Sequence, residues 1–113
     1  MECRRGDIWM CDLGNEGMGS EQCGTRYCVI ISNNIGNHYS SVVTIALITS
    51  KDKDKGKHKI QPTHVPIMLH RSSLIMTEQL RTISKDRLYN FYRKATKEEM
   101  TQIDKALKIS LNI

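Results

Sequence analysis

Short apolar runs, several of them rich in β-branched residues, are divided by turn-forming residues along most of this sequence and limit the folds open to it. The clearest runs lie at residues 7–13, 26–32 and 42–50, and each has the length and residue types of a β-strand. The run at 42–50 is apolar on both faces, which predicts a central strand. Residues 63–69 are expected to form an edge strand, because Pro66 has no N–H to donate to a neighbouring strand.

The segments between these runs are predicted from their turn residues and spacing. Residues 33–41 contain two adjacent asparagines, a glycine and a further asparagine, which is typical of a turn. Residues 73–79 and 80–83 predict either a further pair of strands or one bent strand. Ser84 is expected to cap a short turn that runs through Leu88.

Only the last segment has helical spacing. Thr96 and Glu99 have the spacing of a capping box. The apolar positions that follow at helical intervals are Met100, Ile103, Leu107 and Leu111. We expect an amphipathic helix of about four turns across the sheet. The fold class is therefore mainly β with a C-terminal α-helix, built as a small, strongly bent antiparallel sheet or partly open barrel.

Two segments are expected to be loops. Residues 14–25 carry four glycines, which excludes a helix, and their length indicates a functional role rather than a simple connection. Residues 51–59 contain five Lys and two Asp and are expected to be a solvated loop or hairpin tip. We favour plain solubility slightly over phosphate contact for these lysines.

Length and charge set broad limits. A chain of 113 residues is too short to bury two separate cores, so residues 1–113 are expected to form a single domain. The net charge of +5 favours polyanionic partners, although weakly. Only 5% of the residues are aromatic, so contacts with any single-stranded nucleic acid would depend on hydrogen bonds and charge more than on base stacking.

No membrane segment, disulfide or metal site is expected. The longest apolar stretch, near residues 42–48, is far too short to cross a bilayer, so a cytoplasmic protein is predicted. The cysteines show no CxxC pair and no spacing typical of metal ligands, and in the reducing cytoplasm they are expected to be free thiols. They are Cys3, Cys11, Cys23 and Cys28. We predict no cofactor and no bound metal.

Several motifs in order along the chain resemble one protein family. The sequence RGDIW at residues 5–9 is followed by Asp12 and Leu13, and then by GSEQCGTR at residues 19–26. Later segments that match the same pattern are 29–34, 43–49, 62–65, 78–83 and the closing helix. Together they resemble the MazF/PemK/Kid toxins of type II toxin–antitoxin systems, over nearly the whole chain, and residues 51–59 match least.

The resemblance implies a fold and an activity. It implies an SH3-like barrel of the CcdB/PemK type that forms a homodimer. It also implies a metal-independent, sequence-specific endoribonuclease that cleaves single-stranded RNA by attack of the 2′-hydroxyl, leaves 2′,3′-cyclic phosphate and 5′-hydroxyl ends, and inhibits translation and growth. A MazE-like antitoxin would neutralise it; an acidic, disordered tail that folds on binding would suit its basic groove.

Three residues are predicted to carry the chemistry. The guanidinium of Arg26 suits a phosphorane, because it is always cationic and its planar fork matches two phosphate oxygens. Thr49 is promoted by the family match alone and offers a hydroxyl to a phosphoryl oxygen or to the 2′-hydroxyl. Glu21 is our candidate proton acceptor, with a surface or capping role about equally supported. The family usually has proline after the catalytic arginine; here Tyr27 follows it, which would loosen the site.

Polar side chains near these motifs are predicted to contact unstacked RNA bases along their edges. They are Ser20, Gln22, Asn33, Asn34, Glu78 and Gln79. The four histidines at positions 38, 58, 64 and 70 are acid–base candidates by their ordinary pKa. Nothing in their spacing pairs them, and His64, in an expected strand, is more simply structural.

Two other functions stay open from the sequence. A toxin of the same fold can act by binding a protein target such as DNA gyrase, as CcdB does, without cleaving RNA. The GSEQxGxR loop argues against that class, which lacks it. A homologue in which Tyr27 has weakened catalysis is the other alternative.

Overall fold

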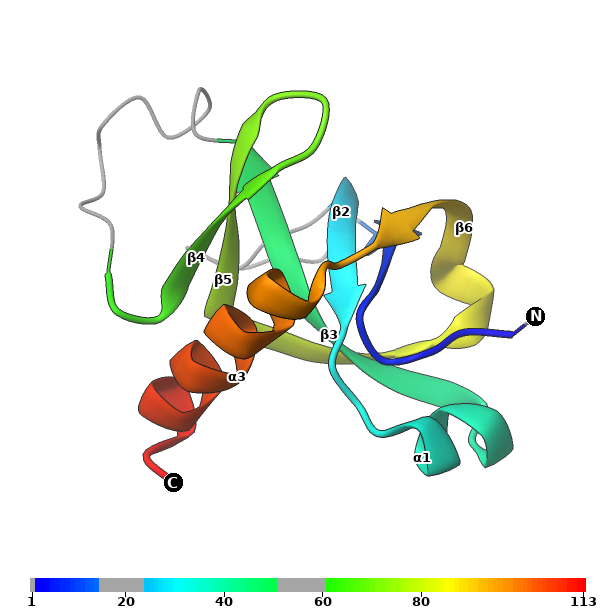
Figure 1. Cartoon of the computed structure of the whole chain (residues 1–113). Helices are drawn as coiled ribbons and strands as arrows, with labels where there is room; N and C mark the ends of the chain where they lie inside the picture. The colour runs from blue at the N-terminus through cyan, green and yellow to red at the C-terminus, as the bar shows by residue number, and fades with distance from the viewer. Residues whose placement is uncertain (1, 15–23, 51–60) are drawn as a thin grey trace.

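The computed structural model describes residues 2–14, 24–50 and 61–113, and these form a curled antiparallel sheet with one long helix (Figure 1). The sheet has six strands in the order β4-β5-β3-β2-β1-β6. The strands are β1 (Asp7–Asp12), β2 (Thr25–Ile30), β3 (Val42–Ser50), β4 (His64–Met68), β5 (Ser72–Ser84) and β6 (Leu88–Lys94). This confirms the predicted fold class.

Strand β3 occupies the centre of the sheet, as its apolar sequence predicts. It pairs with β2 on one side and with β5 on the other. The ladder with β5 is irregular between Ala46 and Leu47, whose partners are Leu80 and Met76. Residues 77–79 are the extra ones at this irregularity, so residues 73–83 belong to one bent strand rather than to a strand pair.

The alternation of side chains along the strands creates two apolar clusters, one on each face of the sheet. Cys28, Ile45 and Leu47 belong to the first cluster, which the curl of the sheet encloses. Val29, Ala46 and Ile48 belong to the second cluster, which the last helix covers. Because both faces of β2 and β3 are buried, a shift of one residue in register would exchange the two sets, and the pairing is strongly fixed.

Helix α3 (Lys97–Leu111) covers the second cluster and packs on β4 and β5 (Figure 1). Its predicted capping box is present: the Thr96 side chain accepts from the Glu99 N–H at 3.1 Å, and the Glu99 carboxylate accepts from the Thr96 N–H at 2.7 Å. Ile103 and Leu107 are buried under it. In the last turn the Ser110 hydroxyl donates to the Thr77 carbonyl of β5 at 3.0 Å, while Ile109 and Leu111 are about half exposed.

Two segments differ from the sequence-based expectation. Residues 34–39 form a short helix, α1 (Asn34–Tyr39), instead of a turn. Asn33 makes the helix possible, because its side-chain oxygen accepts from the Gly36 N–H at 2.8 Å and caps the first turn. Strand β6 was not predicted at all. The expected cap at Ser84 is present and begins the 3₁₀ turn Lys85–Arg87.

Candidate active site

The start of β2 and the end of β3 bring Arg26 and Thr49 together. In the antiparallel register Tyr27 pairs with Ile48, so the next position along each strand sets Arg26 against Thr49. On the far side of β3, Thr49 pairs with Leu74 and Ser50 with Ser73. Arg26, Thr49 and Ser73 therefore lie on three neighbouring strands at one end of the sheet.

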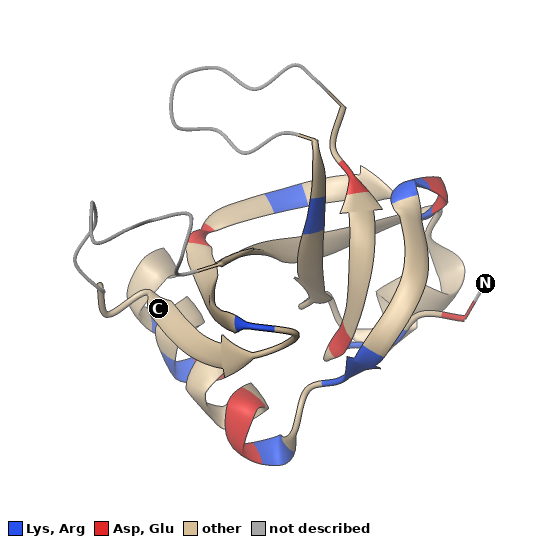
Figure 2. Cartoon of the chain, turned by 90° about the horizontal axis from the view of Figure 1, so that it is seen from above, with Lys and Arg blue, Asp and Glu red and all other residues tan. Residues whose placement is uncertain are grey.

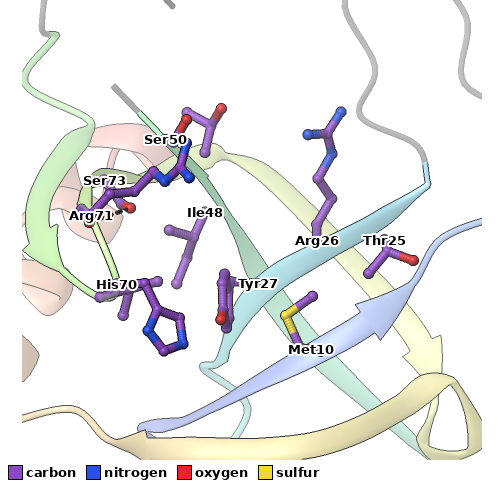
Figure 3. Close-up of a pocket in the computed structure, with 11 residues that line it drawn as sticks. Met10, Thr25, Arg26, Tyr27, Ile48, Ser50, His70, Arg71 and Ser73 are labelled. Atoms are coloured by element: carbon purple, nitrogen blue, oxygen red, sulfur yellow. Dashed lines mark hydrogen bonds between the residues drawn. The ribbon is translucent and has the colours of Figure 1, made fainter. Parts of the chain in front are cut away.

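These strand ends form the wall of a pocket of about 350 Å³. The turn between β4 and β5 closes it from the other side with His70 and Arg71 (Figure 3). The full lining is Met10, Thr25, Arg26, Tyr27, Ile48, Thr49, Ser50, Leu69, His70, Arg71 and Ser73. The structure thus places two of the three predicted catalytic residues in one cavity. This cavity is large enough for part of a nucleotide.

Charge in the pocket favours an anion. Arg26 and Arg71 both line it, and among the described residues that do so none is Asp or Glu. Thr25, Thr49 and Ser50 add hydroxyl groups that can donate, and the Ser73 hydroxyl donates to the Arg71 carbonyl at 3.0 Å. Elsewhere Lys and Arg are spread over several strands and helix α3 and alternate with acidic residues (Figure 2), so net charge alone does not locate this site.

Two glycines position the start of β2. The Leu13 N–H donates to the Gly24 carbonyl at 2.9 Å, and the Gly24 N–H donates to the Gly14 carbonyl at 2.7 Å. Gly14 and Gly24 have φ angles of +72° and +78°, which side-chain-bearing residues rarely adopt. These contacts fix the backbone two residues before Arg26.

Tyr27 stands where the family pattern has proline, and the strand ladder fixes its backbone instead. It pairs with Met10 on β1 and with Ile48 on β3. Its ring contacts those of Tyr92 and His70, at centroid distances of 5.4 and 6.1 Å. Burial, with a smaller contribution from Tyr92, raises the pKa of the Tyr27 phenol, so this side chain stays neutral at physiological pH.

The described residues predicted to contact bases lie outside this pocket in the single chain. Asn33 and Asn34 are at the opposite end of β2, about 20 Å away at the usual rise per residue. The Asn33 side chain caps α1, and the Asn34 side-chain oxygen accepts from the Arg5 N–H at 2.7 Å. Gln79 is partly buried on β5 and does not line the pocket.

Glu78 forms a polar cluster between β4 and β5. One of its carboxylate oxygens is 2.8 Å from His64 Nε2, and the other accepts from the Thr63 hydroxyl at 3.0 Å. His64 Nδ1 accepts from the Gln61 N–H at 3.3 Å, which places the imidazole proton on Nε2. The His64 side chain is 5% exposed, in line with the structural role expected for it.

Some predictions cannot be compared with the structure, and some pocket residues were not predicted. Glu21, Ser20 and Gln22 lie outside the described residues. Arg71 and Ser73 were missed because they come from the β4–β5 turn and the start of β5, which reach the pocket only through long-range pairing. The only indication in the sequence was that an arginine and a serine lie near the start of a predicted strand.

Cysteines and other candidate ligands do not gather into a site in the described parts of the chain. Cys3, Cys11 and Cys28 are free and buried. Burial raises the pKa of the Cys3 thiol. In the segments that the structure describes, no three His, Cys, Asp or Glu side chains come together, and no helix is long and apolar enough to span a membrane.

Comparison with known proteins identifies the family. The family model described as PemK-like, MazF-like toxin of type II toxin–antitoxin system matches residues 4–111. A mycobacterial endoribonuclease solved in complex with its cognate antitoxin superposes with a TM-score of 0.80 at 24% identity, over 98% of this chain and 96% of the other. MazF from Deinococcus radiodurans superposes with a TM-score of 0.79 at 17% identity, over 100% and 99%. The chain belongs to the PemK-like, MazF-like family of toxins of type II toxin–antitoxin systems.

Proposed function

We propose that this toxin is a metal-independent, sequence-specific endoribonuclease that cleaves single-stranded RNA and thereby inhibits translation and growth. The observation that supports this most directly is the shared pocket of Arg26 and Thr49. In the proposed reaction the 2′-hydroxyl of the substrate attacks the adjacent phosphorus. The P–O5′ bond breaks, which leaves a 2′,3′-cyclic phosphate and a 5′-hydroxyl.

Arg26 stabilises the transition state in this mechanism. Negative charge grows on the phosphoryl oxygens as the phosphorus becomes five-coordinate, and a guanidinium binds two such oxygens with parallel hydrogen bonds. An interaction that strengthens as charge develops lowers the barrier rather than merely tightening substrate binding. The high pKa of arginine makes it a poor proton acceptor.

Thr49 is proposed to orient the reacting groups. Its hydroxyl, across the ladder from Arg26, donates to a phosphoryl oxygen or holds the 2′-hydroxyl in line. Glu21 remains our prediction for the residue that accepts the 2′-hydroxyl proton. The chemistry requires such an acceptor, and a second group that protonates the leaving 5′-oxygen.

Base contacts are proposed for the polar residues named from the sequence. Ser20, Gln22, Asn33, Asn34, Glu78 and Gln79 stay predictions for this role. Glu78 is already engaged by His64 and Thr63, so an RNA base would have to compete with these contacts. Asn33 and Asn34 are also engaged, with the Gly36 N–H and the Arg5 N–H, so substitution of any of these three residues is expected to reduce specificity and stability together.

An antitoxin and a second copy of the chain are the proposed protein partners. The mycobacterial relative was solved with its cognate antitoxin, and a MazE–MazF complex of Deinococcus radiodurans also shares the fold, with a TM-score of 0.76. A MazE-like antitoxin is therefore proposed for this toxin. Exposed apolar side chains at Met68 on edge strand β4, at Phe91 on edge strand β6 and at Leu111 on α3 support the proposed homodimer.

Incubation of the purified protein with a long RNA in excess EDTA tests this function. We expect fragments with cyclic phosphate and 5′-hydroxyl ends. Arg26→Ala should abolish their formation, and Arg26→Lys should restore little, because a lysine lacks the planar fork. Arg4→Ala, which removes the same charge from an exposed position outside the pocket, is the matched control and should cleave normally. RNA left intact by the wild type would favour a toxin that acts by binding a protein target such as DNA gyrase.

A further inference from the structure

The pocket around Arg26 has two chemically different sides, and the strand geometry explains why. Successive side chains on a strand point in opposite directions, so Arg26 and Thr49 face one way while their neighbours Tyr27 and Ile48 face the other. All four nevertheless line the same cavity at the strand ends. One side is cationic and hydroxyl-rich, and the other is aromatic and apolar.

The turn between β4 and β5 repeats this division. His70 and Arg71 are also adjacent in the chain. The Arg71 side chain reaches toward Ser50, whereas the His70 ring lies beside Tyr27 (Figure 3). Two sequence-adjacent pairs, Arg26–Tyr27 and His70–Arg71, thus each supply one guanidinium to the polar side and one ring to the other.

The rings form a fixed group with an accessible surface. The centroids of His70 and Tyr92 are 4.9 Å apart with the planes at 72°, and those of Tyr27 and Tyr92 are 5.4 Å apart at 67°. Tyr27 and His70 are tilted at 49°. None of these three pairs is stacked face to face. Tyr92 supports the group from β6, outside the pocket, while His70 is exposed and Tyr27 partly exposed.

A nucleotide matches this division, because it carries a flat aromatic base and an anionic phosphate on different sides of the sugar. We propose that Tyr27 and His70 form a stacking platform for the RNA base adjacent to the phosphate bound at Arg26. The few aromatic residues of the chain had suggested that stacking contributes little, but a count of rings ignores that the fold gathers them at the pocket. This inference rests on the proposed function and adds a positioning role for two residues.

The neutral state of Tyr27 is consistent with the platform. A phenolate beside the phosphate would repel it; a tyrosine is neutral at physiological pH because its ordinary pKa is about 10, and burial raises the pKa of Tyr27 further. Stacking depends on the ring and not on the hydroxyl. The platform therefore tolerates a change from tyrosine to phenylalanine but not to an aliphatic residue.

Binding of an RNA that cannot be cleaved provides the test. We would measure the Kd of a fluorescent 2′-fluoro RNA of mixed sequence, which lacks the attacking hydroxyl. Tyr27→Leu should weaken binding about tenfold or more, as expected for loss of one stacked base, whereas Tyr27→Phe should stay within about threefold of wild type. A comparison of His70→Leu with His70→Phe repeats the test at an exposed position, where a substitution should not disturb the fold. Tyr39→Leu removes an exposed ring outside the pocket and should change nothing.

The outcomes separate this inference from the proposed function. Equal affinity of wild type, Tyr27→Leu and His70→Leu would overturn the platform, and so would a Phe variant that binds as weakly as its Leu counterpart. A wild type that binds RNA through these rings but cleaves no RNA would contradict the proposed function and support the platform. Absence of any RNA binding by the folded wild type would overturn both.

Discussion

Arg26 and Thr49 line the same pocket, and each lies one position beyond Tyr27 and Ile48, the last pair of the β2–β3 ladder. Their proximity is set by main-chain pairing between two central strands and not by the side chains themselves. Both strands are buried on both faces, so the register is among the most strongly fixed features of the fold. The spacing of the two groups is therefore built into the core.

Removal of the Thr49 hydroxyl should impair catalysis and leave the fold intact. Thr49→Val keeps the shape of the side chain, and we expect the cleavage rate to fall about 100-fold, as for loss of one donor to developing charge. Thr49→Ser retains the hydroxyl and should keep most of the rate. Initial rates on a defined oligonucleotide and thermal melts would measure both effects. Full activity of Thr49→Val would remove Thr49 from the mechanism.

Two glycine substitutions should change stability in opposite directions. Gly24 has a φ of +78°, and a Cβ there would meet nothing within 4 Å, so Gly24→Ala should cost about 1 kcal/mol from backbone strain alone. Gly36 lies inside α1, where an added Cβ would make ordinary contact with Asn33. Gly36→Ala should therefore stabilise by about 0.5 kcal/mol. Urea unfolding measures both, and a Gly24→Ala variant at least as stable as wild type would show that the positive φ at Gly24 carries no strain.

The Arg93–Glu99 ion pair should make stability dependent on pH in acid. The two guanidinium nitrogens of Arg93 lie 2.8 and 3.0 Å from the carboxylate oxygens of Glu99. The hydrogen bonds from Arg93, followed by those of the Thr96 cap, lower the pKa of Glu99 below its ordinary value. A group whose pKa is lowered on folding adds stability at neutral pH, and this contribution disappears as the pH falls through the folded-state pKa.

A comparison of Glu99→Gln with Glu98→Gln isolates the contribution of the Glu99 charge to stability. The glutamine at position 99 can still accept at the cap, so only the charge is lost, and we expect a decrease of about 1 kcal/mol in unfolding free energy at pH 7. The difference from wild type should vanish once the pH is well below the lowered pKa of Glu99. Glu98 is an exposed carboxylate in the same helical turn and should show a smaller effect. A Glu99 difference that persists unchanged at low pH would exclude an origin in ionisation.

The predictability of the fold differed between its elements. Strand β3 and helix α3 were predictable because their sequence patterns agree with their packing. The run that is apolar on both faces forms the central strand, and the capping box begins the helix. Helix α1 was missed because a single capping bond from Asn33 outweighs turn-like composition. Strand β6 was missed because its alternation is interrupted: Asn90 has a φ of +52°, and the pairing with β1 shifts register beside Trp9.

The site was predictable only where one motif carried it. Arg26 and Thr49 follow from the family pattern, and the ladder then explains why they meet. His70 and Arg71 come from the turn between β4 and β5, and they reach the pocket because β5 bends and pairs with β3. No local pattern contains that information, since it depends on pairing between distant segments.

The most direct test of the central claim removes a single oxygen atom from the substrate. An oligonucleotide that carries the mapped cleavage motif is compared with one in which only the 2′-hydroxyl at the scissile position is replaced by hydrogen. Both substrates are tested in the presence of EDTA. If Arg26 and Thr49 stabilise attack by that hydroxyl, the deoxy substrate should bind with similar affinity but should not be cut. The all-ribose substrate should yield a 2′,3′-cyclic phosphate. Cleavage of the deoxy substrate at the same bond would contradict the account, because the nucleophile would then have to come from somewhere other than the RNA.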